Sequence, residues 1–140
     1  MKFLASDIAG VVIVEARPST DARGGFARLH CPEDFAAAGL PFVPVQTSLS
    51  TNPASGTLRG VHFQNAPHAE TKLVRAVRGR IFDVVVDLRR DSPTHRRWIA
   101  TELSADNGRG VFIPEGVAHG FLTLEPDSDV LYQIDRKSVV

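Results

Sequence analysis

Hydrophobic and polar residues alternate with a period of two along most of the chain, in short runs separated by turn signals. Successive side chains of a β-strand point to opposite faces of a sheet, so this alternation predicts strands. Nine strands are predicted, at Val11–Glu15, Gly25–His30, Val43–Ser50, Thr57–Phe63, Leu73–Val77, Ile81–Leu88, Trp98–Leu103, Val117–Leu124 and Asp129–Ile134.

Helical periodicity is confined to one short segment, Pro32–Ala38, where proline suits the first turn of a helix. Turn dipeptides such as Asn52-Pro53 and Arg78-Gly79 separate the strands. Many short strands with regular turns are typical of an antiparallel sandwich or barrel. A chain of 140 residues fits one domain, so residues 1–140 are predicted to form a single all-β domain.

The run Ile81–Leu88 is largely apolar on both of its faces, which favours a central strand. Asp83 and Asp87 share a face with Ile81 and Val85. A buried carboxylate at Asp83 is costly unless it is paired. The alternative is that Asp83 lies at a strand end near solvent.

Charge and composition exclude several classes of partner. Sixteen basic residues balance sixteen acidic ones, so long nucleic acid or an anionic membrane is not expected, although a local basic pocket for a small anion remains open. The single cysteine, Cys31, permits no internal disulfide and suits a cytoplasmic protein. Asp7 and Gly10 interrupt the apolar N-terminal run, which is therefore interpreted as mature protein, and no run is long enough to span a membrane.

Two stretches resemble the paired motifs of the cupin superfamily. Gly110–His119 ends in Pro-x-Gly-x-x-His, whose histidine is a ligand in metal-binding cupins. The other motif usually supplies His-x-His and a glutamate, but here those places hold His62, Gln64 and Lys72. An ammonium group opposes a bound cation, and two histidines are too few for a typical metal site. No metal is therefore predicted.

His62, Lys72 and Tyr132 instead suit acid–base chemistry. Histidine can act as a base near neutral pH, lysine can stabilise an enolate oxygen, and a phenol can return a proton. Together they indicate proton abstraction next to a carbonyl group followed by reprotonation. Each residue has a structural alternative, as a hydrogen-bonded core histidine, a solvated lysine and a rim aromatic.

Four segments closely resemble the dTDP-4-dehydrorhamnose 3,5-epimerase family. They are DARGGF from Asp21, GTLRGVHFQ from Gly56, KLVRAVRGRIFDVVVDLRRDSPT from Lys72 and FIPEGVAHGFLTLEPDSDVLYQ from Phe112. The resemblance implies a homodimeric jelly-roll isomerase that needs no cofactor. Such an enzyme inverts the carbons flanking the ketone of a dTDP-linked 4-keto-6-deoxy sugar, as in rhamnose biosynthesis.

The resemblance also implies roles for individual residues. His62 would be the base, Tyr132 the acid on the opposite ring face, and Lys72 the support of the enolate, held by Asp83. The residues assigned to substrate binding are Arg23 and Arg59 for the diphosphate, Phe26 near the base, Gln46 and Ser48 in the nucleotide pocket, and His119 in the sugar pocket.

Strand parity places a constraint on this arrangement. Arg59 and His62 have opposite parity, so a regular strand would send them to opposite faces. A bulge at Gly60 would restore a common face; alternatively, one of the two residues serves a site shared with a partner chain. Lys72 can point inward while Leu73 and Arg75 point outward.

The chain departs from the family pattern at Arg28, where glutamate is usual, and at Ser48, where asparagine is usual. Both changes fall in the nucleotide-binding region, so whether the protein prefers a thymidine nucleotide stays open. Family members also continue past the tyrosine to an aspartate that hydrogen-bonds the catalytic histidine, whereas this sequence ends at Val140. The alternatives are a binding-only cupin, a ketoisomerase on the same substrate class, and a metal-dependent cupin isomerase or oxygenase.

Overall fold

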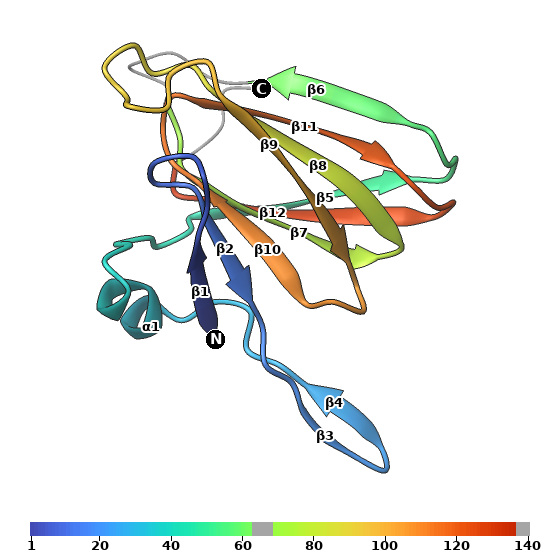
Figure 1. Ribbon diagram of the computed structural model, residues 1–140. Helices are drawn as coiled ribbons and strands as arrows, with labels where there is room; N and C mark the ends of the chain where they lie inside the picture. The colour runs from blue at the N-terminus through green and yellow to red at the C-terminus, as the bar shows by residue number, and fades with distance from the viewer. Residues whose placement is uncertain (63–68, 137–140) are drawn as a thin grey trace.

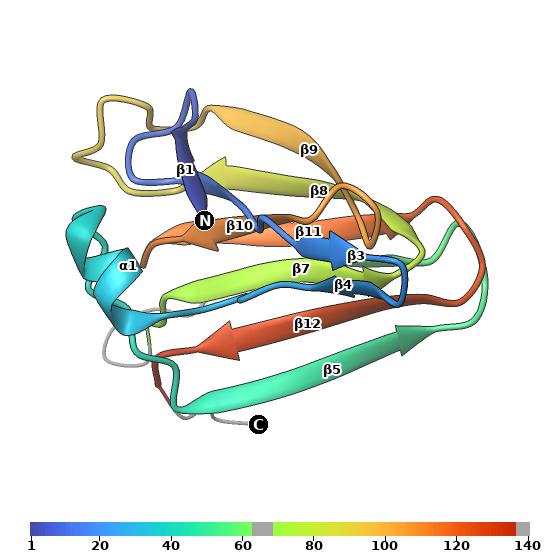
Figure 2. The ribbon, with the colours of Figure 1, turned by 90° about the horizontal axis from the view of Figure 1, so that it is seen from below.

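Two antiparallel sheets face each other in the structure, a computed structural model that describes residues 1–62 and 69–136 (Figures 1 and 2). The larger sheet contains, in spatial order, β1 (Lys2–Ala5), β2 (Val12–Glu15), β10 (Arg109–Ile113), β7 (Lys72–Arg78), β12 (Ser128–Ile134) and β5 (Gln46–Asn52). The smaller sheet contains β6 (Leu58–His62), β11 (Val117–Thr123), β8 (Arg80–Asp87) and β9 (Trp98–Ser104).

Hydrophobic side chains fill the space between the sheets. Val74 and Val130 from the larger sheet pack with Val85 and Phe121 from the smaller one in a single cluster. A second cluster lies on the outer face of the larger sheet, where α1 (Pro32–Ala37) buries Phe35 against Leu73 and neighbouring aromatic rings. The larger sheet is therefore covered on both faces along β2, β10 and β7.

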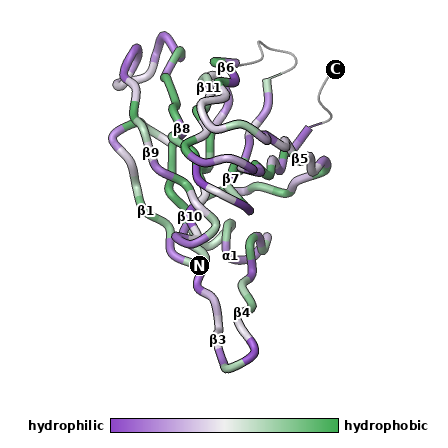
Figure 3. The backbone as a smooth tube through the Cα atoms, turned by 90° about the vertical axis from the view of Figure 1, so that its right-hand side faces the viewer, coloured by the Kyte–Doolittle hydropathy of each residue, from purple (hydrophilic) through white to green (hydrophobic). Residues whose placement is uncertain are grey.

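A separate hairpin, formed by β3 (Ser19–Asp21) and β4 (Gly24–Phe26), projects away from both sheets (Figures 1 and 3). Asp21 stabilises its turn by accepting bonds from the backbone N–H of Arg23, at 2.8 Å, and from its guanidinium group. Phe26, at the base of the hairpin, is 81% exposed. Within residues 1–62 and 69–136, no helix has the length and apolar character that a membrane span requires.

The predicted antiparallel all-β fold is confirmed, and each of the nine predicted strands overlaps an observed one. Two of them differ from the prediction by three residues or more at one end: β4 stops at Phe26 instead of His30, and β5 begins at Gln46 instead of Val43. Three strands, β1, β3 and β10, are not among those predicted, because they are short or lie within the apolar N-terminal run or the Gly110–His119 motif. Phe63, the predicted end of one strand, lies outside the described residues.

β8 is a central strand, as predicted, since β11 and β9 pair with its two edges. Ile81, Asp83, Val85 and Asp87 are all buried on its inner face. Asp83 lies in the middle of the strand and is 2% exposed, so the alternative that placed it near solvent is wrong.

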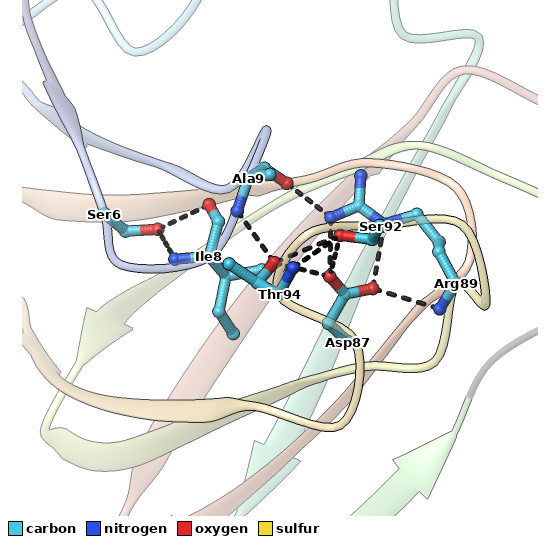
Figure 4. A network of polar contacts seen from close by, with 7 residues as sticks. All are labelled: Ser6, Ile8, Ala9, Asp87, Arg89, Ser92 and Thr94. Carbon is cyan, nitrogen blue, oxygen red and sulfur yellow. Dashed lines mark hydrogen bonds and ion pairs between the residues drawn. The ribbon is translucent and has the colours of Figure 1, made fainter.

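Asp87, at the end of β8, anchors the loop between β8 and β9 (Figure 4). Its carboxylate accepts two bonds from the guanidinium of Arg89, at 2.9 and 3.0 Å, and further bonds from the hydroxyls of Ser92 and Thr94. Arg89 and Thr94 in turn bond to the backbone of Ala9. This network holds the loop against the N-terminal segment.

Burial raises the pKa of Asp87, but the hydrogen bonds from Arg89, Ser92 and Thr94 outweigh that effect. The pKa of Asp87 is therefore lowered overall.

Replacing Asp87 should therefore destabilise the fold. We expect Asp87→Ala to lower the free energy of unfolding by about 3 kcal/mol, because it removes a buried carboxylate and leaves the partly buried guanidinium of Arg89 and the hydroxyls of Ser92 and Thr94 without their acceptor. The exposed Asp91 is the matched control, and Asp91→Ala should change stability by less than about 0.5 kcal/mol. Because folding lowers the pKa of Asp87, its contribution should be full well above the unfolded-state pKa of about 3.9 and decline progressively as the pH falls from there towards the lowered pKa of the folded state. Urea unfolding of both variants at pH 7 and pH 3 checks this, and equal losses for the two variants at pH 7 would contradict it.

Candidate active site

Polar side chains of the larger sheet face inward from three adjacent strands. Ser48 of β5 lies opposite Tyr132 of β12, and Tyr132 lies opposite Val74 of β7. Directly opposed residues share a face, and Val74 belongs to the core between the sheets, so that face is the inner one. By the same register, Gln46 and Lys72 face inward, because both lie opposite Ile134.

The smaller sheet presents His62 and Arg59 to the same space because β6 contains a bulge. Arg59 pairs with Phe121 and His62 pairs with His119, so three steps along β6 match two steps along β11. Gly60 lies within the bulge, with φ at +103° and with Gly120 so close that a Cβ atom would approach its Cα to 2.7 Å. The bulge at Gly60, one of the two alternatives raised by strand parity, is therefore present, and it places Arg59 and His62 on a common face.

His119 and Asp83 form a buried pair in the smaller sheet. Nε2 of His119 lies 2.5 Å from Oδ2 of Asp83, and both side chains are almost completely buried. The two residues are diagonal neighbours, since Asp83 pairs with Phe121 and His119 with Val85. Burial raises the pKa of Asp83, while the charges of His119 and Lys72 oppose that rise.

The expected partner of Lys72 has to be corrected. Asp83 was expected to hold Lys72, but its hydrogen bond goes to His119, and Lys72 acts on it only through charge. The ion pair of Lys72 is with Glu70, at 3.5 Å, and both side chains are buried. Glu70 is not among the predicted residues, although its position two residues before Lys72 is the signal that could have indicated the pair.

Tyr132 packs edge-on against the ring of His119, with ring centroids 5.9 Å apart, and so joins the two sheets. Burial raises the pKa of the Tyr132 phenol, and the charge of Asp83 raises it further, while Arg59 opposes both. The phenol therefore keeps its proton at neutral pH, which is the state required of a proton donor.

Arg23 and Phe26 are not brought to this site. Both belong to the projecting β3–β4 hairpin, which lies at the opposite end of the molecule from β6 (Figure 1). Gln64, one of the places compared with a cupin metal ligand, lies outside the described residues. In the part of the chain that the structure describes, no group of three His, Cys, Asp or Glu side chains is arranged to hold a metal ion.

Fold and site together define a cupin-type β-sandwich that carries acid–base side chains between its sheets. Residues 5–138 match the family described as dTDP-4-dehydrorhamnose 3,5-epimerase. The chain therefore belongs to the dTDP-4-dehydrorhamnose 3,5-epimerase family, a family of isomerases.

Known relatives agree with this assignment. The dTDP-4-dehydrorhamnose 3,5-epimerase of Sinorhizobium fredii is 40% identical over 134 residues, covering 96% of this chain and 69% of the relative. The crystal structure of the Bacillus anthracis enzyme with TDP and pyrophosphate bound superposes with a TM-score of 0.96, at 39% identity, over 99% of this chain and 79% of that one. The Legionella pneumophila enzyme in complex with dTDP-4-keto-L-rhamnose gives a TM-score of 0.92, at 32% identity, over 99% and 73%.

The bulge that aligns His62 with Arg59 should depend on Gly60. We expect Gly60→Ala to lower the free energy of unfolding by about 3 kcal/mol, because a Cβ atom adds backbone strain and a clash with Gly120. Gly56 is a matched control: its φ is +82° but a Cβ atom there meets nothing within 4 Å. Gly56→Ala should cost only about 1 kcal/mol of backbone strain. Chemical denaturation of both variants measures the difference, and equal costs would argue against a closely packed bulge.

Proposed function

We propose that the protein is an epimerase that inverts one or both carbons flanking the ketone of a dTDP-linked 4-keto-6-deoxy sugar, without a cofactor. The observation that carries the proposal is the placement of His62 on the smaller sheet and Tyr132 on the larger one, both on inner faces. A sugar ring bound between the sheets would meet a base on one side and a protonated phenol on the other.

The proposed reaction needs only proton transfers. His62 removes the proton from a carbon next to the ketone, and the electron pair moves onto the ketone oxygen to form an enolate. The ammonium group of Lys72 stabilises that oxygen, and Glu70 holds Lys72 at the start of β7. Tyr132 then gives a proton to the opposite face of the same carbon, which inverts it. The raised pKa of Tyr132 supports this assignment, since the phenol reaches the enolate still protonated.

The relatives support the class of substrate. The Legionella pneumophila structure contains a dTDP-linked keto sugar, and the Bacillus anthracis structure contains TDP and pyrophosphate. In this chain Arg59 is the cation on the inner face of β6 that suits a diphosphate, because a guanidinium fork matches phosphate oxygens. Gln46, Ser48 and His119 complete the proposed set of ligands to the nucleotide and sugar.

A binding-only protein is the second candidate. His62 is exposed at the end of β6, and within the described residues no carboxylate accepts a hydrogen bond from its ring. Such a carboxylate would fix the tautomer and stabilise the imidazolium that forms. This observation favours slow turnover or binding alone. A ketoisomerase would need the same base and is separated from the epimerase by its product.

Solvent deuterium exchange tests the proposed reaction. The wild-type protein should incorporate deuterium from D₂O next to the ketone of a dTDP-4-keto-6-deoxyhexose, as followed by NMR. His62→Ala should slow exchange by at least about 100-fold, because the base is lost, while leaving substrate binding intact. Tyr132→Phe should retain exchange but alter the product stereochemistry. Binding by the wild type without any exchange would select the binding-only candidate.

The protein is also proposed to be a homodimer, and the outer face of β7, β12 and β5 supports this. Arg75, Leu131 and Leu49 form a cross-strand row there, and Leu49 is exposed. Arg75 is buried, donates from Nη2 to the carbonyl of Leu29 at 3.1 Å, and has no partner for Nε in the described structure. Burial lowers its pKa to about 10. An exposed leucine beside a buried guanidinium whose Nε has no partner supports an interface on this face.

The partner's hairpin would then complete the site. Arg23 and Phe26 belong to a hairpin that projects away from β6, the strand of His62, and a projecting, exposed hairpin can reach a second protomer. This placement reconciles the binding roles that the family resemblance gives to Arg23 and Phe26 with their position in the fold.

Two further predictions from the sequence stay proposals. Residues 1–140 are proposed to form one domain, which the core shared between both sheets supports. The protein is proposed to be cytoplasmic, which the free Cys31 supports.

Mixing two inactive variants tests a shared site. Arg23→Ala and His62→Ala should each be inactive alone, the first because the partner's site loses its arginine. Random mixing and reassociation should restore about a quarter of wild-type activity, because half of the dimers are mixed and each has one intact site. Size-exclusion chromatography should show dimers throughout. No recovery on mixing would mean that Arg23 acts within its own chain or not at all.

A further inference from the structure

Asn52, the last residue of β5, is a buried amide whose orientation is fixed by its neighbours. It is only 1% exposed. Its Nδ2 donates to the carbonyl of Ser128 at 3.0 Å, and more weakly to the carbonyl and hydroxyl oxygens of Ser50. An amide has donors at one end and an acceptor at the other, so these bonds determine that Oδ1 faces the other way.

Oδ1 of Asn52 accepts a hydrogen bond from Nε of Arg59, at 2.7 Å. This short, charge-assisted bond crosses from the larger sheet to the smaller one. Arg59 belongs to the exposed edge strand β6, where an arginine side chain would otherwise sample many rotamers. Holding the guanidinium at Nε restricts that freedom and leaves the remaining N–H donors for a ligand.

We propose that Asn52 is a positioning residue that orients the guanidinium of Arg59 for the diphosphate of the substrate. The inference rests on the proposed function in taking Arg59 as a ligand of the diphosphate. Ordering a long side chain before the ligand arrives removes part of the entropy lost on binding.

The amide is better suited to this task than a carboxylate. An aspartate at position 52 would also bond to Arg59, but its charge would cancel that of the guanidinium and repel a bound phosphate. Asn52 orients the cation and leaves its charge intact. Arg59 also lies close enough to Tyr132 that its charge opposes the rise in the phenol's pKa, so its orientation bears on the proposed acid as well.

A double-mutant cycle tests the inference, with binding of dTDP measured by calorimetry. Asn52→Ala should raise the Kd of dTDP about twofold to tenfold, the expected effect of releasing one ordered side chain. In an Arg59→Ala background the same substitution should change the Kd no further, because Asn52 acts through Arg59. Asn52→Asp should weaken binding more than Asn52→Ala. Thr51→Ala is the control: its side chain is exposed, and the Kd should be unchanged.

The cycle separates positioning from general destabilisation. An equal loss of affinity in both backgrounds, or no loss in either, would overturn the role of Asn52. If Asn52→Ala does not fold, Asn52→Ser supplies the same comparison, since its hydroxyl can bond to Ser128 but is too short to reach Arg59. Failure of the wild-type protein to bind dTDP would overturn the proposed function and this inference with it. This outcome is distinct from the others because it is seen with the wild-type protein, before any variant is measured.

Discussion

The buried pair of Asp83 and His119 is the constraint around which the site is built. A carboxylate in the middle of a central strand is tolerated only if a partner faces it, because isolated charge in an apolar interior is strongly unfavourable. The register between β8 and β11 supplies that partner as a diagonal neighbour. Tyr132 then packs against the histidine from the opposite sheet, and Lys72 adds a positive charge nearby. The space between the sheets is therefore apolar along part of its length. The rest of it is lined by the paired side chains of Asp83 and His119, with Tyr132 and Lys72 beside them.

This arrangement supports the proposal that the scaffold performs proton transfer without a metal. The position from which a metal-binding cupin would offer a carboxylate holds Lys72, and Glu70 pairs with it. His119, a ligand in such cupins, is instead engaged by Asp83. What remains accessible is a histidine at the end of β6, while Tyr132 lies on the facing sheet. These groups favour abstraction and return of a proton over chemistry at a cation.

Much of the fold could be predicted from the sequence, because period-two alternation is a local property that each strand carries by itself. Strand parity also indicated a bulge at Gly60 as one of two ways to reconcile the opposite parity of Arg59 and His62, and the register between β6 and β11 contains that bulge. The partner of Asp83 was predicted wrongly because it depends on the register between strands, which the sequence of one strand does not encode. The distance of Arg23 and Phe26 from the site depends on where a hairpin projects, which is likewise a tertiary property. Asn52 and Glu70 were missed because their roles consist of contacts with other residues.

The central claim is that a base and an acid on facing sheets act on one carbon of a keto sugar from opposite sides. The most direct measurement is the fate of a single turnover of a dTDP-4-keto-6-deoxyhexose in D₂O. The account predicts a product inverted at a carbon flanking the ketone, with deuterium at that carbon. Recovery of the sugar with unchanged configuration and no deuterium, from a protein that demonstrably binds it, would contradict the account.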